Sequence, residues 1–383
     1  MFTEQKGHEP RLSGSGYIPG LDGLRAISIT LVMVAHFGFE RTVPGGLGVT
    51  IFFFLSGFLI TGLLLSEQAD SGRISLLNFY ARRFLRLGPE LLLLLAFSLT
   101  VGLLYREVAA IDIIAMLTWT TNYVTLYREP LGLAMRWPHL WSLAVEEHFY
   151  LTFPLLMILI GPRLRLLLVV LVGVCVTALA WRLCIVHWGG IGAFSQLSEH
   201  PYTYVATDTR CDSIAFGCIT AVLFRLWHGR SNGSRVGGLM LLGCGALMVV
   251  SLVVRNAAFR ESLRYSVQGL AMVMLFVGLY RSQAGDWLIS LLENPIPRKM
   301  GVLSYGAYLW HLEVPFIMFR ITGISASHAP SKQKILMIIF GFVWAYGMAE
   351  ISFRASAPIR RLRGRFHKAS IAKCIITSEK FPS

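Results

Sequence analysis

The segment 21–40, LDGLRAISITLVMVAHFGFE, is long enough to cross a membrane and yet carries two ionisable residues. A helix of roughly 20 apolar residues spans the ~30 Å hydrocarbon core of a bilayer. Arg25 lies near the start of this segment and His36 near its end. Eleven helical residues turn through about 1100°, three turns and about 20°, so both side chains project from one face, about 16 Å apart. Such a pair indicates a functional site, although an interfacial Arg25 and a His36 satisfied inside a bundle are the structural alternative.

The chain as a whole has the composition of a polytopic membrane protein. Only 15% of its 383 residues are charged and its mean hydropathy is +0.60, which leaves too little polar surface for a soluble protein of this size. We predict an all-α fold, a bundle of about ten transmembrane helices. The expected spans are residues 21–40, 45–65, 90–105, 140–160, 166–186, 212–227, 236–254, 263–280, 301–321 and 335–353. The segment 109–123 is short for a crossing and is expected to be a partial or interfacial element.

The distribution of positive charge predicts the orientation of the bundle. The net charge is +14, and most Arg and Lys residues fall in loops on the side of the N-terminus. The positive-inside tendency therefore places both termini in the cytoplasm, with the cluster at 255–264 as an exception. We divide the chain into a polar N-terminus (1–16), a membrane domain (17–361) and a basic tail (362–383) that contacts membrane lipids. The excess charge forms no folded basic domain, so we expect no nucleic-acid partner.

Signals for processing, disulfides and metals are weak. No small-residue cleavage site follows the first apolar run, so we expect the first span to be retained rather than removed as a signal peptide. The six cysteines are scattered and include no CxxC pair. This pattern indicates neither a disulfide framework nor a zinc site, and we expect no metal cofactor.

Three arginines precede the third expected span. Arg82, Arg83 and Arg86, in ARRFLRLGP, stand at positions i, i+1 and i+4, so Arg86 neighbours both of the others on a helix surface. Arginines in such an array suit bidentate recognition of phosphate groups. On the predicted topology, this cluster and Arg25 lie near the cytoplasmic face, whereas His36 lies in the outer half of the membrane.

Acidic and histidine side chains also occur at or inside other spans. The adjacent acids Glu146 and Glu147 lie at the outer mouth of the span 140–160. Each either pairs with an arginine of another helix or binds or deprotonates a substrate. His311 lies inside an otherwise apolar span and is either a site residue or a satisfied core histidine.

A further polar group begins the span 212–227. Asp208, Arg210 and Asp212 occur together in YVATDTRCDSIAFG. They are expected either to contact the substrate or to form a capping and ion-pair network at the start of the helix.

This distribution of charge with depth suits one kind of chemistry. A coenzyme that carries phosphates and a thioester would bind the arginines, and its extended arm would reach His36. The imidazole would then act as a general base toward an acceptor hydroxyl or carry the acyl group transiently, with Glu146 or Glu147 orienting the ring or the acceptor. This hypothesis requires a path between His36 and the arginines. Ser56 is not expected to be the nucleophile, because the GxSxG pattern is absent and membrane serines usually bond their own backbone.

Six motifs occur in one order between residues 17 and 361. They are the pair Arg25 and His36 with ten residues between them, VTIFFFLSGFLI, ARRFLRLGP, WSLAVEEHFY, TDTRCDSIAFG and LSYGAYLWH. Together they resemble the acyltransferase-3 family of membrane O-acyltransferases, which modify bacterial exopolysaccharides, lipopolysaccharide O-antigens, nodulation factors and some macrolides.

The resemblance implies a ten-helix bundle, a cytoplasmic acyl-CoA donor and a hydroxyl acceptor that is often a sugar. It places the essential histidine at His36, the first-helix arginine at Arg25 and the RxxR element at Arg83 and Arg86. The chain departs from the family pattern in two places. His148 stands where a Gln is usual, and the common Glu two residues before a late Pro is absent, since residues 356 and 357 are Ser and Ala.

We therefore predict an O-acyltransferase of the bacterial inner membrane that moves an acyl group, acetyl being the expected one, from acetyl-CoA to a hydroxyl of a carbohydrate or lipid-linked glycan. Acceptor selection is expected in the outer loops, notably 188–207. The alternative is a transporter or flippase that uses intramembrane His, Arg and Glu as a relay or substrate path. No internal repeat of the kind found in many transporters is evident.

Overall fold

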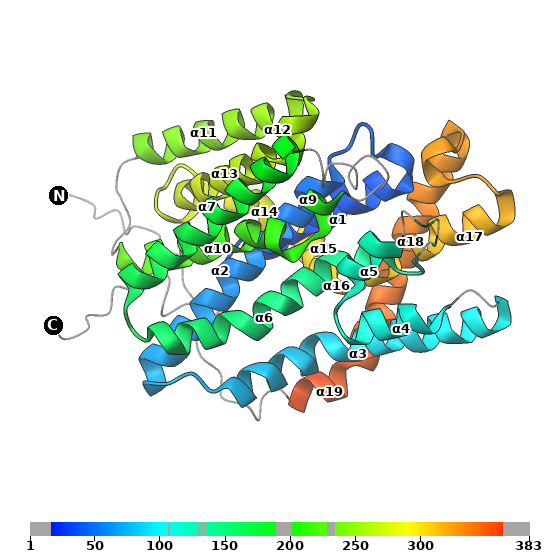
Figure 1. Ribbon diagram of the computed structural model, residues 1–383, viewed down its shortest axis with the longest axis horizontal. Coiled ribbons are helices and arrows are strands. Elements are labelled where there is room, and N and C mark those ends of the chain that lie inside the picture. The colour runs from blue at the N-terminus through cyan, green and yellow to red at the C-terminus, as the bar shows by residue number, and fades with distance from the viewer. Residues whose placement is uncertain are drawn as a thin grey trace, which may run out of the picture.

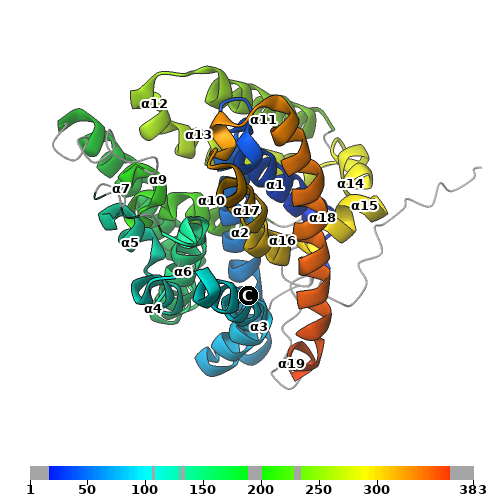
Figure 2. The same ribbon diagram turned by 90° about the vertical axis from the view of Figure 1, so that its right-hand side faces the viewer.

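The computed structural model describes residues 17–105, 108–128, 131, 133, 135–188, 201–227 and 234–362. Every regular element in these ranges is a helix, and the long helices form one bundle (Figures 1 and 2). The predicted N-terminal region 1–16, most of the loop 188–207 and the basic tail beyond residue 362 lie outside the described residues. The predicted all-α class is confirmed.

The long helices of the bundle are separated by short ones. The long helices are α1 (Leu21–Val34), α2 (Gly45–Ser71), α3 (Leu76–Tyr105), α6 (Trp141–Ile160), α7 (Leu164–Trp188), α10 (Thr207–Leu226), α11 (Ser234–Val253), α13 (Leu263–Tyr280) and α18 (Ser331–Ala355). The short α-helices are α4 (Ala110–Leu117), α5 (Thr121–Arg128), α9 (Tyr202–Val205), α12 (Ala257–Glu261), α14 (Asp286–Leu292), α15 (Pro295–Val302), α16 (Ser304–Trp310), α17 (Glu313–Thr322) and α19 (Ala357–Arg361). A π-helical turn η1 (Ala35–Phe39) and two 3₁₀ turns, η3 (Pro138–Leu140) and η4 (Ala326–His328), complete the set.

Seven helical segments among the described residues are long and apolar enough to cross a membrane. They are Leu21–Phe39, Gly45–Ser71, Pro138–Ile160, Leu164–Trp188, Arg235–Val253, Leu263–Tyr280 and Ser331–Ala355. Each coincides with a span expected from the sequence. The expected span 90–105 lies within α3, and the expected span 212–227 lies within α10 except for its last residue. Neither helix is among these seven.

The expected span 301–321 is not one helix. It is divided into the end of α15, α16 and α17, with breaks at Leu303 and at His311 and Leu312. The short segment 109–123 forms α4, of 8 residues, and the beginning of α5. Asp112 in α4 pairs with Arg128 in α5, with 3.0 Å between the carboxylate oxygen and the guanidinium nitrogen.

Helix α2 lies at the centre of the bundle and crosses α10 closely (Figure 1). A Cβ atom on Gly57 of α2 would collide with the backbone of Ile214, and one on Gly217 of α10 would collide with the backbone of Phe54. Small residues therefore allow the two backbones to touch, as in other membrane helix pairs. Next to this crossing, the ring of Phe54 packs edge-on against Phe276 of α13 with 4.7 Å between centroids. This crossing determines which face of α2 packs against α1 and α6.

The C-terminal part of the described chain returns to α3. Helix α18 ends at Ala355, the chain turns at Ser356, and α19 begins with Pro358 in its first turn. Proline suits this position because its ring fixes a helical φ and its missing N–H has no partner there anyway. Figures 1 and 2 show α19 at the foot of α18, beside α3. This turn brings the last residues of the membrane domain to the same region as the arginine-rich start of α3.

Candidate active site

A cavity of about 860 Å³ lies between α1, α2, α3, α6, α16 and α19. Its lining includes five arginines from three helices, and we call it the arginine cavity. They are Arg25, Arg83, Arg86, Arg360 and Arg361. The same lining includes three carboxyl groups, those of Asp22, Glu90 and Glu146. The surplus of guanidinium groups makes the cavity suited to an anionic ligand.

Helix α3 presents one face to the arginine cavity. Arg83, Arg86, Leu87 and Glu90 line it, and their spacing of i, i+3, i+4 and i+7 places them along one side of a helix. Arg82 is rotated by about 100° from Arg83. It lies outside the lining and pairs instead with Glu67 of α2, with 2.6 Å between the two charged groups. The structure thus brings Arg25, Arg83 and Arg86 together and separates Arg82 from them.

Two of the carboxyl groups pair with arginines of the lining. Asp22 contacts Arg25 one turn along α1 at 3.0 Å, and Glu90 contacts Arg360 at 3.0 Å. At the edge of the cavity, the hydroxyl of Tyr17 donates a hydrogen bond of 2.7 Å to Glu293. Burial and then this hydrogen bond raise the pKa of the Tyr17 phenol, so it stays neutral and adds no negative charge to the cavity.

The third carboxyl group, Glu146, is held by two hydroxyl groups. Ser56 of α2 donates to Oε1 at 2.8 Å and Tyr150 donates to Oε2 at 3.3 Å. The guanidinium group of Arg83 lies 4.9 Å from the centre of the Tyr150 ring. Ser56 therefore serves as a hydrogen-bond donor in the cavity wall. Glu147 is not one of the described residues that line the cavity, so the two adjacent acids have different surroundings.

His36 and His311 form a hydrogen-bonded pair. Nδ1 of His36 lies 2.8 Å from Nε2 of His311, and the rings stack with 5.0 Å between centroids. Nδ1 of His311 lies 2.7 Å from the carbonyl oxygen of Tyr308. Because a carbonyl oxygen only accepts, Nδ1 of His311 carries the hydrogen and Nε2 accepts from Nδ1 of His36. In this arrangement of neutral rings, Nε2 of His36 keeps its lone pair and is the basic nitrogen of the pair.

Irregular backbone positions both histidines. His36 lies in the π-helical turn η1, a type of insertion that is frequent at functional sites. His311 lies at the break between α16 and α17, where it is fully buried, whereas His36 is half-buried. The first residue of α17, Glu313, is anchored by a buried ion pair with Arg136 at 2.6 Å. The break is thus held in place from the neighbouring segment that precedes α6.

A third histidine was not expected from the sequence. His139, in the turn η3, is buried, and its ring lies edge-on to His311 with 5.2 Å between centroids. The hydroxyl of Tyr308 donates to the His139 carbonyl at 2.6 Å. The signal in the sequence was its place two residues before the WSL segment, which begins at Trp141. Despite this cluster, the described residues contain no group of His, Cys, Asp or Glu that is arranged to hold a metal ion.

The arginine cavity does not extend to the histidine pair, but one of its lining residues contacts that pair. Tyr308 and Ser142 line the cavity, and their hydroxyl groups are 2.7 Å apart. Tyr308 also contacts His311 through its carbonyl oxygen. Neither His36 nor His311 is among the residues that line the cavity. The cavity therefore does not reach either histidine in this structure, and Tyr308 is a lining residue that contacts His311.

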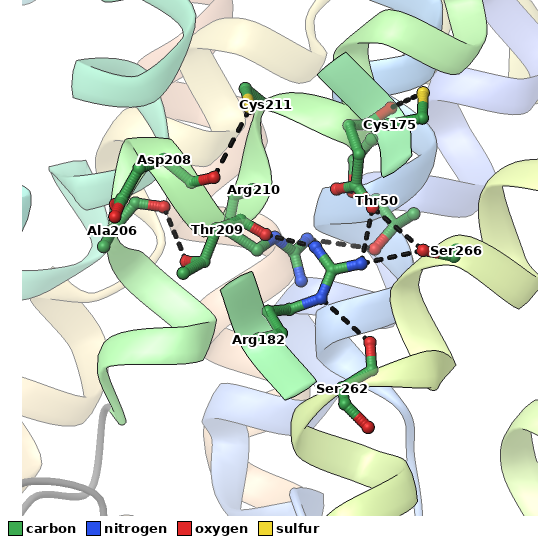
Figure 3. Close-up of polar contacts among 12 residues, drawn as sticks. Thr50, Cys175, Arg182, Ala206, Asp208, Thr209, Arg210, Cys211, Ser262 and Ser266 are labelled. Atoms are coloured by element: carbon green, nitrogen blue, oxygen red, sulfur yellow. Dashed lines mark hydrogen bonds and ion pairs between the residues drawn. The ribbon is translucent and has the colours of Figure 1, made fainter. Parts of the chain in front are cut away.

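Asp208, Arg210 and Asp212 have different side-chain partners, and Figure 3 shows Asp208 and Arg210 with contacts of their own. Asp212 pairs with Arg182 of α7 at 2.6 Å, and neither side chain is exposed. Asp208 accepts hydrogen bonds from the indole of Trp181 at 2.7 Å and from the hydroxyl of Tyr202 at 2.8 Å.

Arg210 has different partners from the two aspartates. It donates to the hydroxyl of Thr50 at 3.1 Å and lies 4.0 Å from the centre of the Tyr265 ring. None of Asp208, Arg210 and Asp212 lines the arginine cavity. Their contacts fit the structural alternative, in which the group helps to hold α10 against its neighbours.

Comparison with known proteins agrees with this arrangement of motifs. A family model described as an acyltransferase domain, acyltransferase 3, matches residues 18–349. The chain therefore belongs to the acyltransferase-3 family. No solved structure matches the chain.

Several curated relatives that match are O-acetyltransferases by name. "Putative O-acetyltransferase SACOL0978" of Staphylococcus aureus strain COL is 31% identical over 360 residues, which cover 90% of this chain and 58% of the relative. The O-acetyltransferase OatA of Staphylococcus aureus strain NCTC 8325 is 30% identical over 378 residues, which cover 93% of this chain and 58% of the relative. The match thus spans little more than half the length of these relatives.

Proposed function

We propose that this chain is an O-acetyltransferase of the bacterial inner membrane that transfers acetyl from acetyl-CoA to a hydroxyl group of a carbohydrate or lipid-linked glycan. In this proposal the helices form about ten spans with both termini in the cytoplasm. The observation that carries it is a cationic cavity that ends beside a pair of hydrogen-bonded histidines. The names of the relatives support acetyl as the group transferred.

The donor would bind in the arginine cavity. Coenzyme A has a diphosphate between its nucleotide and its pantetheine arm, and guanidinium groups bind such oxygens through paired, charge-assisted hydrogen bonds. Arg25, Arg83 and Arg86 all line the cavity, and we assign the diphosphate to them. The arm would then run along α6, past Glu146 and toward Ser142. Glu146, which also lines the cavity, would accept hydrogen bonds from the amide groups of the arm.

His36 would perform the proton transfer. Its Nε2 takes the proton of the acceptor hydroxyl while the oxygen attacks the thioester carbonyl, and the tetrahedral intermediate then collapses to the ester and the coenzyme thiolate. The imidazolium returns the proton to the thiolate, so the products are the acetyl ester and the free thiol. Alternatively, Nε2 first attacks the thioester carbonyl and displaces the coenzyme thiolate. The acceptor hydroxyl then attacks the acetyl group on Nε2, the bond from Nε2 to the acetyl carbon breaks, and the proton of the hydroxyl passes to the thiolate. In both routes His311 is a positioning residue, because its Nε2 accepts the Nδ1 hydrogen of His36.

The thioester must pass Tyr308 and Ser142 to reach His36. The hydroxyl groups of these residues contact each other across the end of the cavity. We propose that this contact opens when the donor binds, because a single hydrogen bond between neutral groups contributes only about 1 kcal/mol net. The acceptor would reach the half-exposed His36 ring from the other side, so that the two substrates meet at Nε2.

Transfer of labelled acetyl groups tests this function. Membranes that contain the wild-type chain are incubated with radiolabelled acetyl-CoA, and label in the glycan and lipid fractions is compared with that from His36→Ala. Loss of the general base should lower transfer about 10²- to 10⁴-fold. Arg354→Gln is a matched control, since Arg354 lies on the exposed side of α18 and pairs with Glu350. Equal transfer by wild type and His36→Ala would end the proposal.

A further inference from the structure

Helix α19 adds two arginines to the cavity beyond those of the RxxR element. Arg360 and Arg361 both line the arginine cavity. They reach it because the chain turns at Ser356, between α18 and α19, and α19 then contacts α3. The cavity therefore has arginines on two walls, one made by α1 and α3 and the other by α19.

Arg360 is fixed on its wall by three contacts. Its Nη1 lies 3.0 Å from Oε1 of Glu90, its guanidinium carbon lies 3.5 Å from the centre of the Phe353 ring, and Nη2 donates to the Phe353 carbonyl. Glu90 is only 5% exposed. A guanidinium group that is already held in this way loses little further freedom when a ligand binds. Arg361, next to it, is exposed at the edge of the cavity.

The other wall is the one connected to the histidines. Arg83 lies over the ring of Tyr150, which donates to Glu146 on α6. Ser142 is one helical turn from Glu146 and contacts Tyr308, the residue that holds His311. A ligand arm that leads to the histidines therefore starts beside Arg83. A group bound by α19 would branch away from that arm.

Coenzyme A carries phosphate groups both in line with its pantetheine arm and on a branch away from it. The diphosphate is continuous with pantetheine, whereas the 3′-phosphate is a branch on the ribose. We propose that Arg360 and Arg361 bind the 3′-phosphate and so make the enzyme select coenzyme A over its 3′-dephospho form. Glu90 is a positioning residue that holds Arg360. This inference rests on the proposed function, because it takes coenzyme A as the ligand of the cavity.

Binding of two nucleotides to the purified chain in lipid nanodiscs tests the assignment. Dissociation constants are measured for coenzyme A and for 3′-dephospho-coenzyme A. The wild type should bind coenzyme A about 10-fold or more tightly than the dephospho form, since the difference is a charge-assisted, bidentate contact. In the double variant Arg360→Gln with Arg361→Gln, the two constants should become nearly equal. In Arg83→Gln both should rise while their ratio is kept.

The controls separate this inference from the function on which it rests. Arg354→Gln removes an arginine of α18 that lies outside the cavity and should change neither constant. Thermal unfolding identifies any variant that is misfolded, and Arg361→Gln alone, which leaves the pair of Glu90 with Arg360 intact, should then still lower the ratio. If the wild type binds neither nucleotide, the proposed donor is wrong. If it binds coenzyme A but without preference, or if the arginine variants keep the preference, only the role of α19 is overturned.

Discussion

The arginines of this protein occur in two contrasting environments. Arg182, near the end of α7, is fully buried, and each of its nitrogens has a partner: Nη2 pairs with Asp212 at 2.6 Å, Nε donates to the Ser262 carbonyl at 2.9 Å, and Nη1 donates to the Thr209 carbonyl (Figure 3). The arginines of the cavity instead border about 860 Å³ of space and outnumber the carboxyl groups around them. The first arrangement is fully buried, whereas the second borders space that a ligand could occupy.

The difference separates a fully buried arginine from arginines that border a cavity in the same bundle. Arg182 and Arg83 both lie on helices of the bundle, so position along the chain does not separate them. What separates them is access to the cavity, which Arg83 lines and which the fully buried Arg182 does not. Arg210 is intermediate, since it is buried among aromatic rings and, among the described residues, its Nε and Nη1 have no hydrogen-bond partner.

The largest effect is expected when the buried pair is broken. Asp212→Ala leaves the Arg182 charge buried without its carboxylate, which typically costs about 3–5 kcal/mol in free energy of unfolding. Thermal and denaturant unfolding of the purified chain in detergent would measure this loss. A change below about 1 kcal/mol, the size expected for an exposed ion pair, would show that the pair with Asp212 is not what holds Arg182.

A smaller effect, on the donor alone, is expected at the cavity. Arg83→Gln removes a charged contact to phosphate and should raise the donor KM about 10- to 100-fold, which corresponds to about 1.5–3 kcal/mol, with little change in the acceptor KM. Arg82→Gln is the matched variant one residue earlier, and it should raise the donor KM far less because Arg82 pairs with Glu67 outside the cavity. Acetyl transfer measured at varied concentrations of each substrate separates the two. If both variants raised the donor KM equally, the orientation of α3 would not decide which arginine binds the donor.

The smallest effect is expected at Arg210. Arg210→Met removes a cation–π contact but also removes a buried charge with incomplete hydrogen bonds, and such replacements are often neutral or stabilising. We expect the free energy of unfolding to change by less than about 1 kcal/mol. The same unfolding measurement applies, with Asp212→Ala as the reference. A loss as large as that of Asp212→Ala would show that aromatic rings satisfy a buried guanidinium group as well as a carboxylate does.

Local patterns predicted much of this arrangement. The all-α class and the seven apolar helices follow from runs of apolar residues long enough to cross a bilayer. The common face of Arg83 and Arg86 follows from the helical repeat. The same repeat explains why Arg82 lies outside the cavity. Adjacent residues on a helix are rotated by about 100° from each other, so Arg82 does not share the face of Arg83.

The remaining features depend on contacts between distant parts of the chain. Pairing of His36 with His311 joins residues 275 positions apart, and no periodicity within one segment specifies it. Arg360 reaches the cavity only because the chain turns at Ser356 and Glu90 accepts its guanidinium group. Arg182 could have been noticed, since it is the only charged residue in the expected span 166–186. Its partner, however, follows only from the packing of α7 against α10.

The turn that carries His36 rests on a glycine. Gly38 has φ of 97°, in the left-handed region, and a Cβ atom there would collide with the carbonyl oxygen of Ala326 in η4. Any larger residue would both strain the backbone and push apart η1, which follows α1, and η4, which precedes α18. The basic nitrogen and the connection between α17 and α18 are therefore mechanically joined, and evolutionary change in one would have to be matched by change in the other.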